Sequence, residues 1–222
     1  VKAAPVLWDK KVTDAGVAQA VVVNTGIANA CTGQAGYENA AETAKLAGEA
    51  LNISSDTVLV ASTGVIGFTL PMDVIADGVK KLSGMLKSDV QSAQDAAEAI
   101  LTTDTHPKQI AYETTIGGKT VTFGAMCKGS GMIHPNMGTM LGFIMTDAAI
   151  SKNLLDKALK GSIEDTFNMV SVDGDTSTND TVLVMANGMA GNPEITEENE
   201  DYEAFKDCLL YTSPSPRDMR RS

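Results

Sequence analysis

The sequence is poor in basic residues, aromatic residues and cysteine, and each shortage excludes a class of protein. Its 222 residues carry 17 Lys and Arg against 28 Asp and Glu, a formal net charge of −11. A protein that binds duplex nucleic acid needs a basic patch to neutralise phosphates, and no such patch is visible. Three Cys are too few for a disulfide scaffold, and a hydrophobic content of 43% excludes a disordered chain. A globular protein of one or two domains is expected.

The sequence also lacks long apolar runs. None approaches the ~20 residues that are needed to cross a bilayer. A basic segment followed by an apolar one, as in a secretory signal, is absent from the start. Cys31, Cys127 and Cys208 are widely spaced and odd in number, which favours free thiols in a reducing compartment. We therefore expect a cytoplasmic protein that contacts neither membrane nor nucleic acid.

Arginine is missing from the first 216 residues, and the three that occur lie within the last six. The segment Tyr211–Ser222 is also rich in Pro and Ser and has no apolar periodicity. It is either a natural disordered tail or a segment foreign to the natural protein, and the abrupt change favours the second. We assign residues 208–222 to this tail and residues 1–207 to the folded part. Val1, in place of Met, indicates that the sequence starts within a longer protein.

Hydrophobic periodicity predicts a mixed α/β or α+β protein with layered helices and sheets. A hairpin is expected around Gly117-Gly118, because Ile110–Ile116 and Val121–Ala125 both alternate in polarity. Helices are predicted at 37–51, 71–86, 88–101 and 151–169, and strands at 17–24, 57–61, 139–146 and 181–186. Residues 194–203 are either the start of an acidic helix or a loop.

The residues that common metal and hydrolase sites require are scarce. A Ser–His–Asp triad needs a histidine base, and the two histidines, His106 and His134, each neighbour a proline. Zinc sites need clustered Cys and His, which are absent. The acidic run from Asp173 resembles a calcium loop, but its sixth and twelfth positions hold Thr178 and Val184 in place of Gly and Glu. A polar turn, which could also shape an active site between a helix and a strand, explains it better, and no metal is expected.

Glycine-rich segments do not follow nucleotide-binding patterns. Gly26, Gly33 and Gly36 lack the G-x-G-x-x-G spacing, and Lys128–Gly131 reverses the order of a P-loop. We expect no cofactor.

Thr139 follows the loop residue Gly138 and begins an apolar run. Cleavage of the bond between them would give Thr139 a free α-amine, with a pKa of about 7.7–8.0. That amine could deprotonate the hydroxyl of the same residue without any histidine. Spacing alone favours the simpler interpretation, in which a threonine merely opens a strand.

Several longer motifs change this balance. They are VKAAPV (1–6), VVVNTGIANACTGQAG (21–36), ASTGVIG (61–67), LTTDTHPK (101–108), KGSGMIHPNMGTMLGF (128–143) and SVDGDTSTNDT (171–181). In this order they resemble the ornithine acetyltransferase / bifunctional glutamate N-acetyltransferase family of arginine biosynthesis. The resemblance runs from Val1 to about Asp207.

The resemblance implies an N-terminal-nucleophile-like enzyme with an αββα-type layered sandwich, truncated here. It implies self-cleavage between Gly138 and Thr139. Residues 1–138 would then be the C-terminal part of the first product, and residues 139–207 the N-terminal part of the second. Thr139 would be the nucleophile. Family members often have Ala before this Thr, and the smaller Gly138 should still permit the acyl shift.

The family motifs also imply roles for four further residues. Thr63 and Gly64 would form the oxyanion hole, and Thr102 and Lys128 would contact substrate together with Thr139. The implied reaction moves acetyl from N-acetylornithine to glutamate through an acetyl-threonine ester. Acetyl-CoA is a second donor in bifunctional members, and the expected assembly has two copies of each product. Family members are longer, so we expect this chain alone to be inactive.

Two alternatives from other classes remain open at this point. An N-terminal-nucleophile aminopeptidase would share the self-cleavage and the layers but would hydrolyse small peptides. A non-catalytic binding protein on the same scaffold would never cleave before Thr139.

Overall fold

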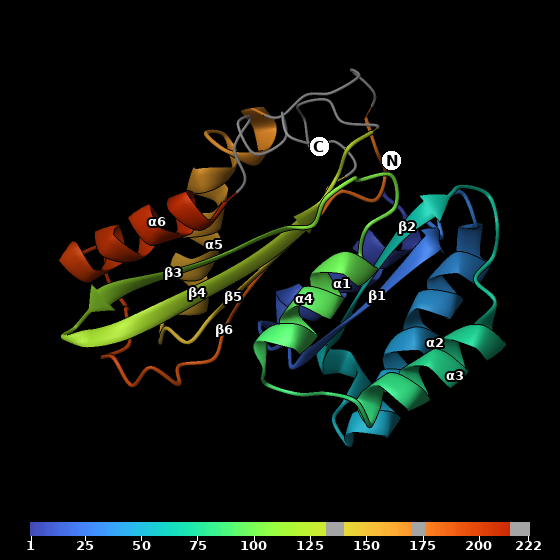
Figure 1. Ribbon diagram of the computed structural model, residues 1–222, viewed down its shortest axis with the longest axis horizontal. Coiled ribbons are helices and arrows are strands. Elements are labelled where there is room, and N and C mark those ends of the chain that lie inside the picture. Colours follow the sequence, from blue (N-terminus) through green and yellow to red (C-terminus); the bar gives the residue numbers. More distant parts are fainter. Residues whose placement is uncertain (132–139, 170–175, 214–222) are drawn as a thin grey trace. The chain divides into compact units, whose positions relative to one another are not determined.

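The computed structural model describes residues 1–131, 140–169 and 176–213, and the chain forms two compact units (Figure 1). Unit 1 comprises Val1–Thr102 together with the short segment Thr178–Thr181. Unit 2 comprises Thr103–Ser177 and Val182–Ser222. The first contains a parallel strand pair with helices and the second an antiparallel hairpin with helices, so the predicted mixed α/β class is confirmed.

Unit 1 is built around a β-α-β arrangement. Strands β1 (Ala20–Ile27) and β2 (Val58–Val65) pair in parallel, and helix α2 (Gly33–Leu51) lies between them in sequence, followed by a 3₁₀ turn (Ser55–Thr57). Parallel strands need such a crossover, because a tight hairpin can join only antiparallel ones. The strand register runs without a break along both strands, so their carboxyl ends lie level with each other.

Helix α1 (Ala4–Ala15) precedes this arrangement, although the sequence pattern predicts no element there. Its Trp8 indole Nε1 donates to the Val58 carbonyl at 2.9 Å, and its Asp9 Oδ1 accepts from the Val60 N–H at 2.8 Å. The helix therefore pairs with backbone groups on the edge of β2 that β1 leaves open. A buried Asp on the inner face interrupts the apolar stripe, which is why periodicity misses this helix.

Helices α3 (Met72–Ser83) and α4 (Val90–Ala99) complete unit 1. Both fall within the predicted ranges and are shorter. Asp89 caps α4 by accepting from the Ser92 N–H at 2.7 Å, which satisfies one of the unpaired donors at the helix start.

Unit 2 contains a four-stranded sheet in the order β3-β4-β5-β6. The strands are β3 (Lys108–Ile116), β4 (Lys119–Lys128), β5 (Leu141–Thr146) and β6 (Thr181–Ala186). The predicted hairpin is confirmed, and its ladder is longer than predicted. Gly117 and Gly118 have φ of 55° and 74°, the left-handed values that a two-residue hairpin turn requires.

Helices α5 (Lys152–Ile163) and α6 (Glu200–Thr212) supply the helical part of the unit 2 core. The rings of Phe123 and Phe205 lie 5.1 Å apart, and α6 packs against β3 and β4 (Figure 1). Helix α5 ends earlier than predicted, and a 3₁₀ turn (Phe167–Met169) follows. Helix α6 includes Cys208 and Leu209, both buried in this core.

All three cysteines are free thiols, as the sequence predicts. Within the described ranges, no helix is long and apolar enough to cross a membrane.

Candidate active site

The carboxyl ends of β1 and β2 bring together the first group of predicted site residues. Thr63 pairs with Thr25, and Gly64 pairs with Gly26. Thr63 is buried, whereas Gly64 is exposed. Ligands of open α/β sheets bind where parallel strands end at their carboxyl side, so this is the expected position for a reactive site.

Glycine is required at position 64 by the close approach of the two strands. Gly64 has φ of 130°, and a Cβ there would lie 2.2 Å from the carbonyl carbon of Gly26. Gly26 itself has φ of 107°. No other residue fits such a contact, so the glycine of the ASTG motif has a structural reason independent of the reaction.

The open edge of β2 explains how Gly64 could serve as a donor. Along this edge α1 engages first Val58 and then Val60, and the amide of Asn179 engages the carbonyl of Ser62 at 2.9 Å. Backbone groups of alternate residues point to the same edge of a strand. The next N–H in this series is therefore that of Gly64, at the exposed end of the strand.

Side chains fix the backbone just before this end. The Ser62 hydroxyl donates to Asn24 Oδ1 at 2.6 Å, and the Asn24 amide donates to the Ile27 carbonyl at 2.8 Å. The Asn179 amide also donates to the Ala28 carbonyl at 2.6 Å. These contacts join both strand ends, so the side chains of Asn24, Ser62 and Asn179 together fix the backbone at the candidate site.

Asn179 is a residue to which sequence reasoning assigns no role. It lies in the polar run that begins at Asp173, which the sequence predicts to be a turn able to shape an active site. The structure describes this run from residue 176 onwards. The available sequence signal is an asparagine two residues before the apolar strand β6. Its hydrogen-bond partners lie more than a hundred residues away in the sequence, so no local pattern indicates them.

Thr102 lies at the surface of unit 1, beyond α4. The Thr25 hydroxyl donates to the carbonyl of Ala99 at 3.4 Å. Because Thr25 pairs with Thr63, this contact brings the chain that leads to Thr102 toward the end of the strand pair.

Lys128 belongs to unit 2, where it is the last residue of β4 and is buried. The residue after it is held by a buried ion pair. Asp104 Oδ1 accepts from the Gly129 N–H at 2.8 Å and from Lys108 Nζ at 2.6 Å. The Asp104 side chain is fully buried and that of Lys108 nearly so. The hairpin end and the chain that enters it are thus tied together beside Lys128.

Gly138 and Thr139, the predicted cleavage point and nucleophile, lie outside the described residues. Among the residues that are described, no group of three or more His, Cys, Asp or Glu could hold a metal ion.

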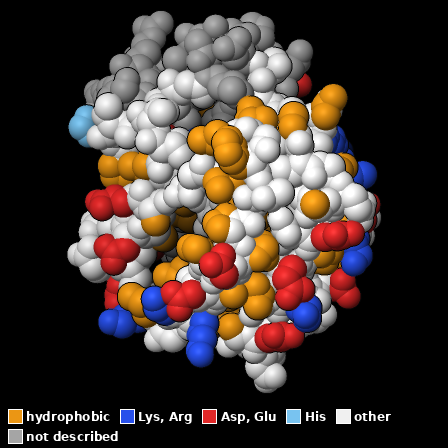
Figure 2. Space-filling model, turned by 90° about the vertical axis from the view of Figure 1, so that its right-hand side faces the viewer, with side chains coloured by type: hydrophobic (Ala, Val, Ile, Leu, Met, Phe, Trp, Pro, Cys, Tyr) orange, Lys and Arg blue, Asp and Glu red, His pale blue; other side chains and the backbone are white. Residues whose placement is uncertain are grey.

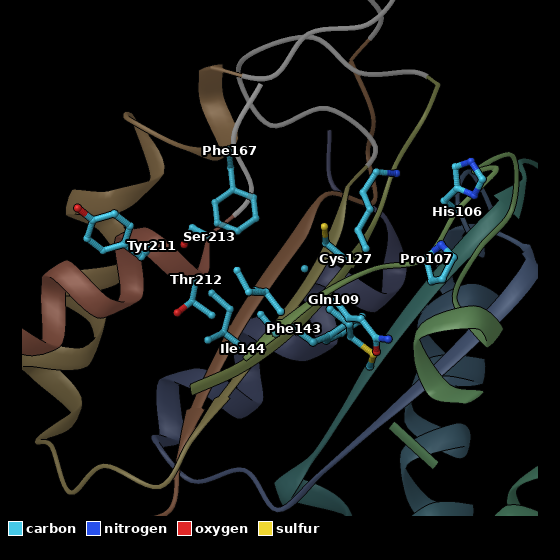
Figure 3. Close-up of a pocket in the computed structure, with 15 residues that line it drawn as sticks. His106, Pro107, Gln109, Cys127, Phe143, Ile144, Phe167, Tyr211, Thr212 and Ser213 are labelled. Carbon is cyan, nitrogen blue, oxygen red and sulfur yellow. The ribbon is translucent and has the colours of Figure 1, made fainter. Parts of the chain in front are cut away.

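A separate cavity of about 440 Å³ lies in unit 2, between the sheet and the end of α6 (Figure 3). Ile144, Phe143 and Phe167 make it largely apolar, and His106 lies at its border. None of the described predicted site residues lines it.

Burial perturbs one carboxyl group close to the strand pair. Desolvation raises the pKa of Asp9 to about 7, and the hydrogen bond from Val60 lowers it by a smaller amount. Its second oxygen has no partner in the described structure. The group is thus poised to change charge near neutral pH.

The comparisons with known proteins point in one direction. The ArgJ family matches residues 1–214. The arginine biosynthesis bifunctional protein ArgJ of Symbiobacterium thermophilum is 56% identical over 209 residues, which are 94% of this chain and 52% of that protein. The protein of the same name from Lactococcus lactis is 54% identical over 207 residues, 93% of this chain and 51% of that protein.

Two solved structures are similar as well. The arginine biosynthesis bifunctional protein from Bacillus halodurans has a TM-score of 0.57 and 44% identity, covering 64% of this chain and 72% of that one. Ornithine acetyltransferase from Mycobacterium tuberculosis, solved in complex with ornithine, has a TM-score of 0.55 and 37% identity, with the same coverage.

The chain spans about half the length of the curated relatives it matches. The family match nevertheless covers nearly all of the chain, and it includes every motif on which the sequence resemblance rests. The resemblance is therefore confirmed, and the chain belongs to the ArgJ family.

Proposed function

We propose that the protein containing this chain is an acetyltransferase of arginine biosynthesis that moves acetyl from N-acetylornithine to glutamate. The observation that carries the proposal is the high identity, above 50%, to relatives named as bifunctional proteins of arginine biosynthesis. Their name supports a second activity, the acetylation of glutamate by acetyl-CoA. The ornithine in one related structure supports the substrate class.

The nucleophile is generated by cleavage of the chain itself. The Thr139 hydroxyl attacks the carbonyl carbon of Gly138, the peptide C–N bond breaks, and an ester forms. Water then hydrolyses the ester, leaving a carboxylate on Gly138 and a free α-amine on Thr139. The amine, with a pKa of about 7.7–8.0, can accept the hydroxyl proton in the later steps.

Acetyl transfer follows in two half-reactions. The Thr139 oxygen attacks the acetyl carbonyl of N-acetylornithine, the amide C–N bond breaks, and ornithine leaves with the proton held by the α-amine. The amine of glutamate next attacks the acetyl ester. The Thr139 oxygen leaves, regains a proton, and N-acetylglutamate is released. Neither half-reaction requires a cofactor.

Thr63 and Gly64 stabilise the oxyanion of each tetrahedral intermediate. The exposed position of Gly64, with its N–H next in line on the open edge of β2, supports this role. Removal of one such donor costs about 2.7–4 kcal/mol in the enzymes where it has been measured.

Thr102 and Lys128 bind substrate in this proposal. The ammonium group of Lys128 is suited to a substrate carboxylate, which both N-acetylornithine and glutamate carry. We further propose that the two cleavage products stay associated as a cytoplasmic heterotetramer with two copies of each.

The first experiment extends this chain to the full length of its relatives and compares it with Thr139→Ala and Thr139→Ser variants. Intact mass should show two products, the second beginning at Thr139, for the unmutated and Ser forms only. Transfer of acetyl from N-acetylornithine to glutamate should follow the same pattern.

An uncut, inactive unmutated protein would overturn the proposal and favour the binding-protein alternative. Cleavage followed by hydrolysis of small peptides, without acetyl transfer, would favour the aminopeptidase.

A further inference from the structure

Asn179 makes contacts that no other part of the proposed mechanism uses. Its side chain is buried, with 4% of the residue exposed. The amide nitrogen donates to the carbonyls of Ser62 and Ala28 at 2.9 and 2.6 Å. Ser62 is on β2 directly before Thr63, and Ala28 directly follows β1. One amide group therefore joins the ends of both strands.

The contact with Ser62 controls the backbone that leads to Gly64. The Ser62 carbonyl and the Gly64 N–H are successive groups on the same edge of β2, because the strand alternates. Fixing the carbonyl fixes the direction in which the strand presents the next N–H. The end of β2 has no further strand partner on this edge within the described structure, so Asn179 is the last anchor before the exposed glycine.

The position of Asn179 in the chain adds a second consequence. The proposed cleavage between Gly138 and Thr139 separates Asn179 from both of its carbonyl partners. The segment Thr178–Thr181 nevertheless belongs to unit 1, and the Thr178 carbonyl accepts from the Ala3 N–H at 2.9 Å. After cleavage these hydrogen bonds would connect the two products.

We propose that Asn179 is a positioning residue whose amide, from the second cleavage product, aims the oxyanion-binding end of β2 in the first. This inference rests on the proposed function. It makes the oxyanion hole dependent on both products, so the product that carries Thr63 and Gly64 does not hold a competent donor geometry by itself.

The chemistry of the contact requires an amide. Two carbonyl oxygens need two hydrogens, and the Asn side-chain nitrogen supplies both. Its oxygen accepts from the Thr178 hydroxyl at 3.1 Å, which orients the amide. An ionised carboxylate of the same shape would have no hydrogen to give and would repel both carbonyls.

Asn192 offers a matched control. It is also buried, with 5% exposed, and its amide donates to the carbonyls of Ala149 and Pro193 at 3.1 and 2.8 Å. All three residues follow the cleavage point and lie in unit 2. An Asn192→Ala variant therefore removes a comparable buried amide without touching β2 or the link between products.

The experiment compares Asn179→Ala, Asn192→Ala and the unmutated protein at the full length of the family. For Asn179→Ala we expect kcat for acetyl transfer to fall about thirtyfold, because the oxyanion donor is misaimed rather than removed. The KM for N-acetylornithine should stay within about twofold, because oxyanion donors act mainly in the transition state. The cleaved products should also separate at a lower urea concentration.

For Asn192→Ala we expect a similar loss of stability in unit 2, with kcat unchanged and the products separating as in the unmutated protein. If both variants lose kcat equally, or if Asn179→Ala leaves kcat unchanged, the inference is wrong. An unmutated protein without acetyl transfer would instead refute the proposed function, which keeps the two failures distinct.

If Asn179→Ala does not fold, the isosteric variant Asn179→Asp gives a second readout. Its kcat, relative to that of the unmutated protein, should rise as the pH falls, because a protonated carboxyl regains one hydrogen to donate. A constant ratio across pH would overturn the positioning role.

Discussion

At the scale of single residues, the buried Asp9 is the clearest conflict between environment and chemistry. Its carboxyl is needed as an acceptor for the Val60 N–H, yet burial raises its pKa from 3.8 to about 7. A protonated carboxyl can still accept that hydrogen bond through its carbonyl oxygen, so the folded chain favours the protonated form.

This conflict predicts a pH-dependent stability. The pKa of Asp9 is higher in the folded chain than in the unfolded chain. The contribution of its protonated carboxyl to the free energy of unfolding is therefore complete below pH 4 and is lost as the pH rises through about 7. An Asp9→Asn variant should lose that dependence and exceed the unmutated chain at pH 8 by up to about 4 kcal/mol in the free energy of unfolding. Urea unfolding at pH 4.5, 6 and 8 measures it.

The exposed Asp14 on the same helix provides the control, because Asp14→Asn makes the same chemical change without removing a buried carboxyl group. Parallel pH curves for Asp9→Asn and the unmutated chain would contradict the prediction.

Gly64 leads to a second prediction at this scale. Gly64→Ala should destabilise unit 1 by about 3 kcal/mol or more, since it combines an unfavourable φ with overlap against Gly26. Gly67 has φ of 86°, and a Cβ added there would meet no atom within 4 Å. Gly67→Ala should therefore cost only about 1–2 kcal/mol. Equal losses for the two variants, measured by urea unfolding, would show that the close approach of the strands is not the cause.

At the scale of elements, the ion pair at the open end of the β3–β4 hairpin orders the chain beside Lys128. Lys108→Met should destabilise unit 2 by about 3 kcal/mol, because it leaves the buried Asp104 carboxylate without its cation. Adding Asp104→Asn to it should recover most of the loss, since the Asn oxygen still accepts from Gly129. A double variant that is less stable than the single one in thermal unfolding would contradict this account.

The elements also show what a single sequence can predict. The hairpin follows from alternation and two glycines, both of which are local signals. Helix α1 escapes prediction because it places Asp9 on its inner face for the edge of β2, a need that only the folded neighbour reveals. The same holds for Asn179. Thr63 and Gly64 can be named from family motifs, but the reason for the glycine depends on Gly26, which is distant in the sequence.

At the scale of the whole molecule, a group of large hydrophobic side chains is exposed to solvent in unit 1. Large hydrophobic side chains lie at the surface of unit 1 on and around α3, and Figure 2 shows many hydrophobic side chains on one face. They include Phe68, Val74, Leu82, Met85 and Leu86. Large exposed apolar patches promote association.

We expect a Met85→Gln/Leu86→Gln double variant of the 222-residue chain to bind less of a hydrophobic dye and to aggregate at a higher concentration. Its free energy of unfolding should change by less than about 0.5 kcal/mol per site, because both side chains are exposed. Light scattering against concentration measures the effect. Lys87→Gln, a change at a neighbouring exposed position that removes no apolar surface, is the control and should leave dye binding unchanged.

The chain returns to unit 1 at Thr178–Thr181, after the segment Thr103–Ser177 of unit 2, and this has a consequence for the order of folding and cleavage. The hydrogen bond from Asn179 to Ala28 closes a loop of 151 residues. While the chain is continuous this is an intramolecular event, whose entropic cost grows only with the logarithm of loop length. If the chain is cut between Gly138 and Thr139 as proposed, the same contact becomes a bimolecular encounter whose yield depends on protein concentration. Folding before such a cut would make assembly independent of expression level, whereas a premature cut would leave two partners to find each other by diffusion.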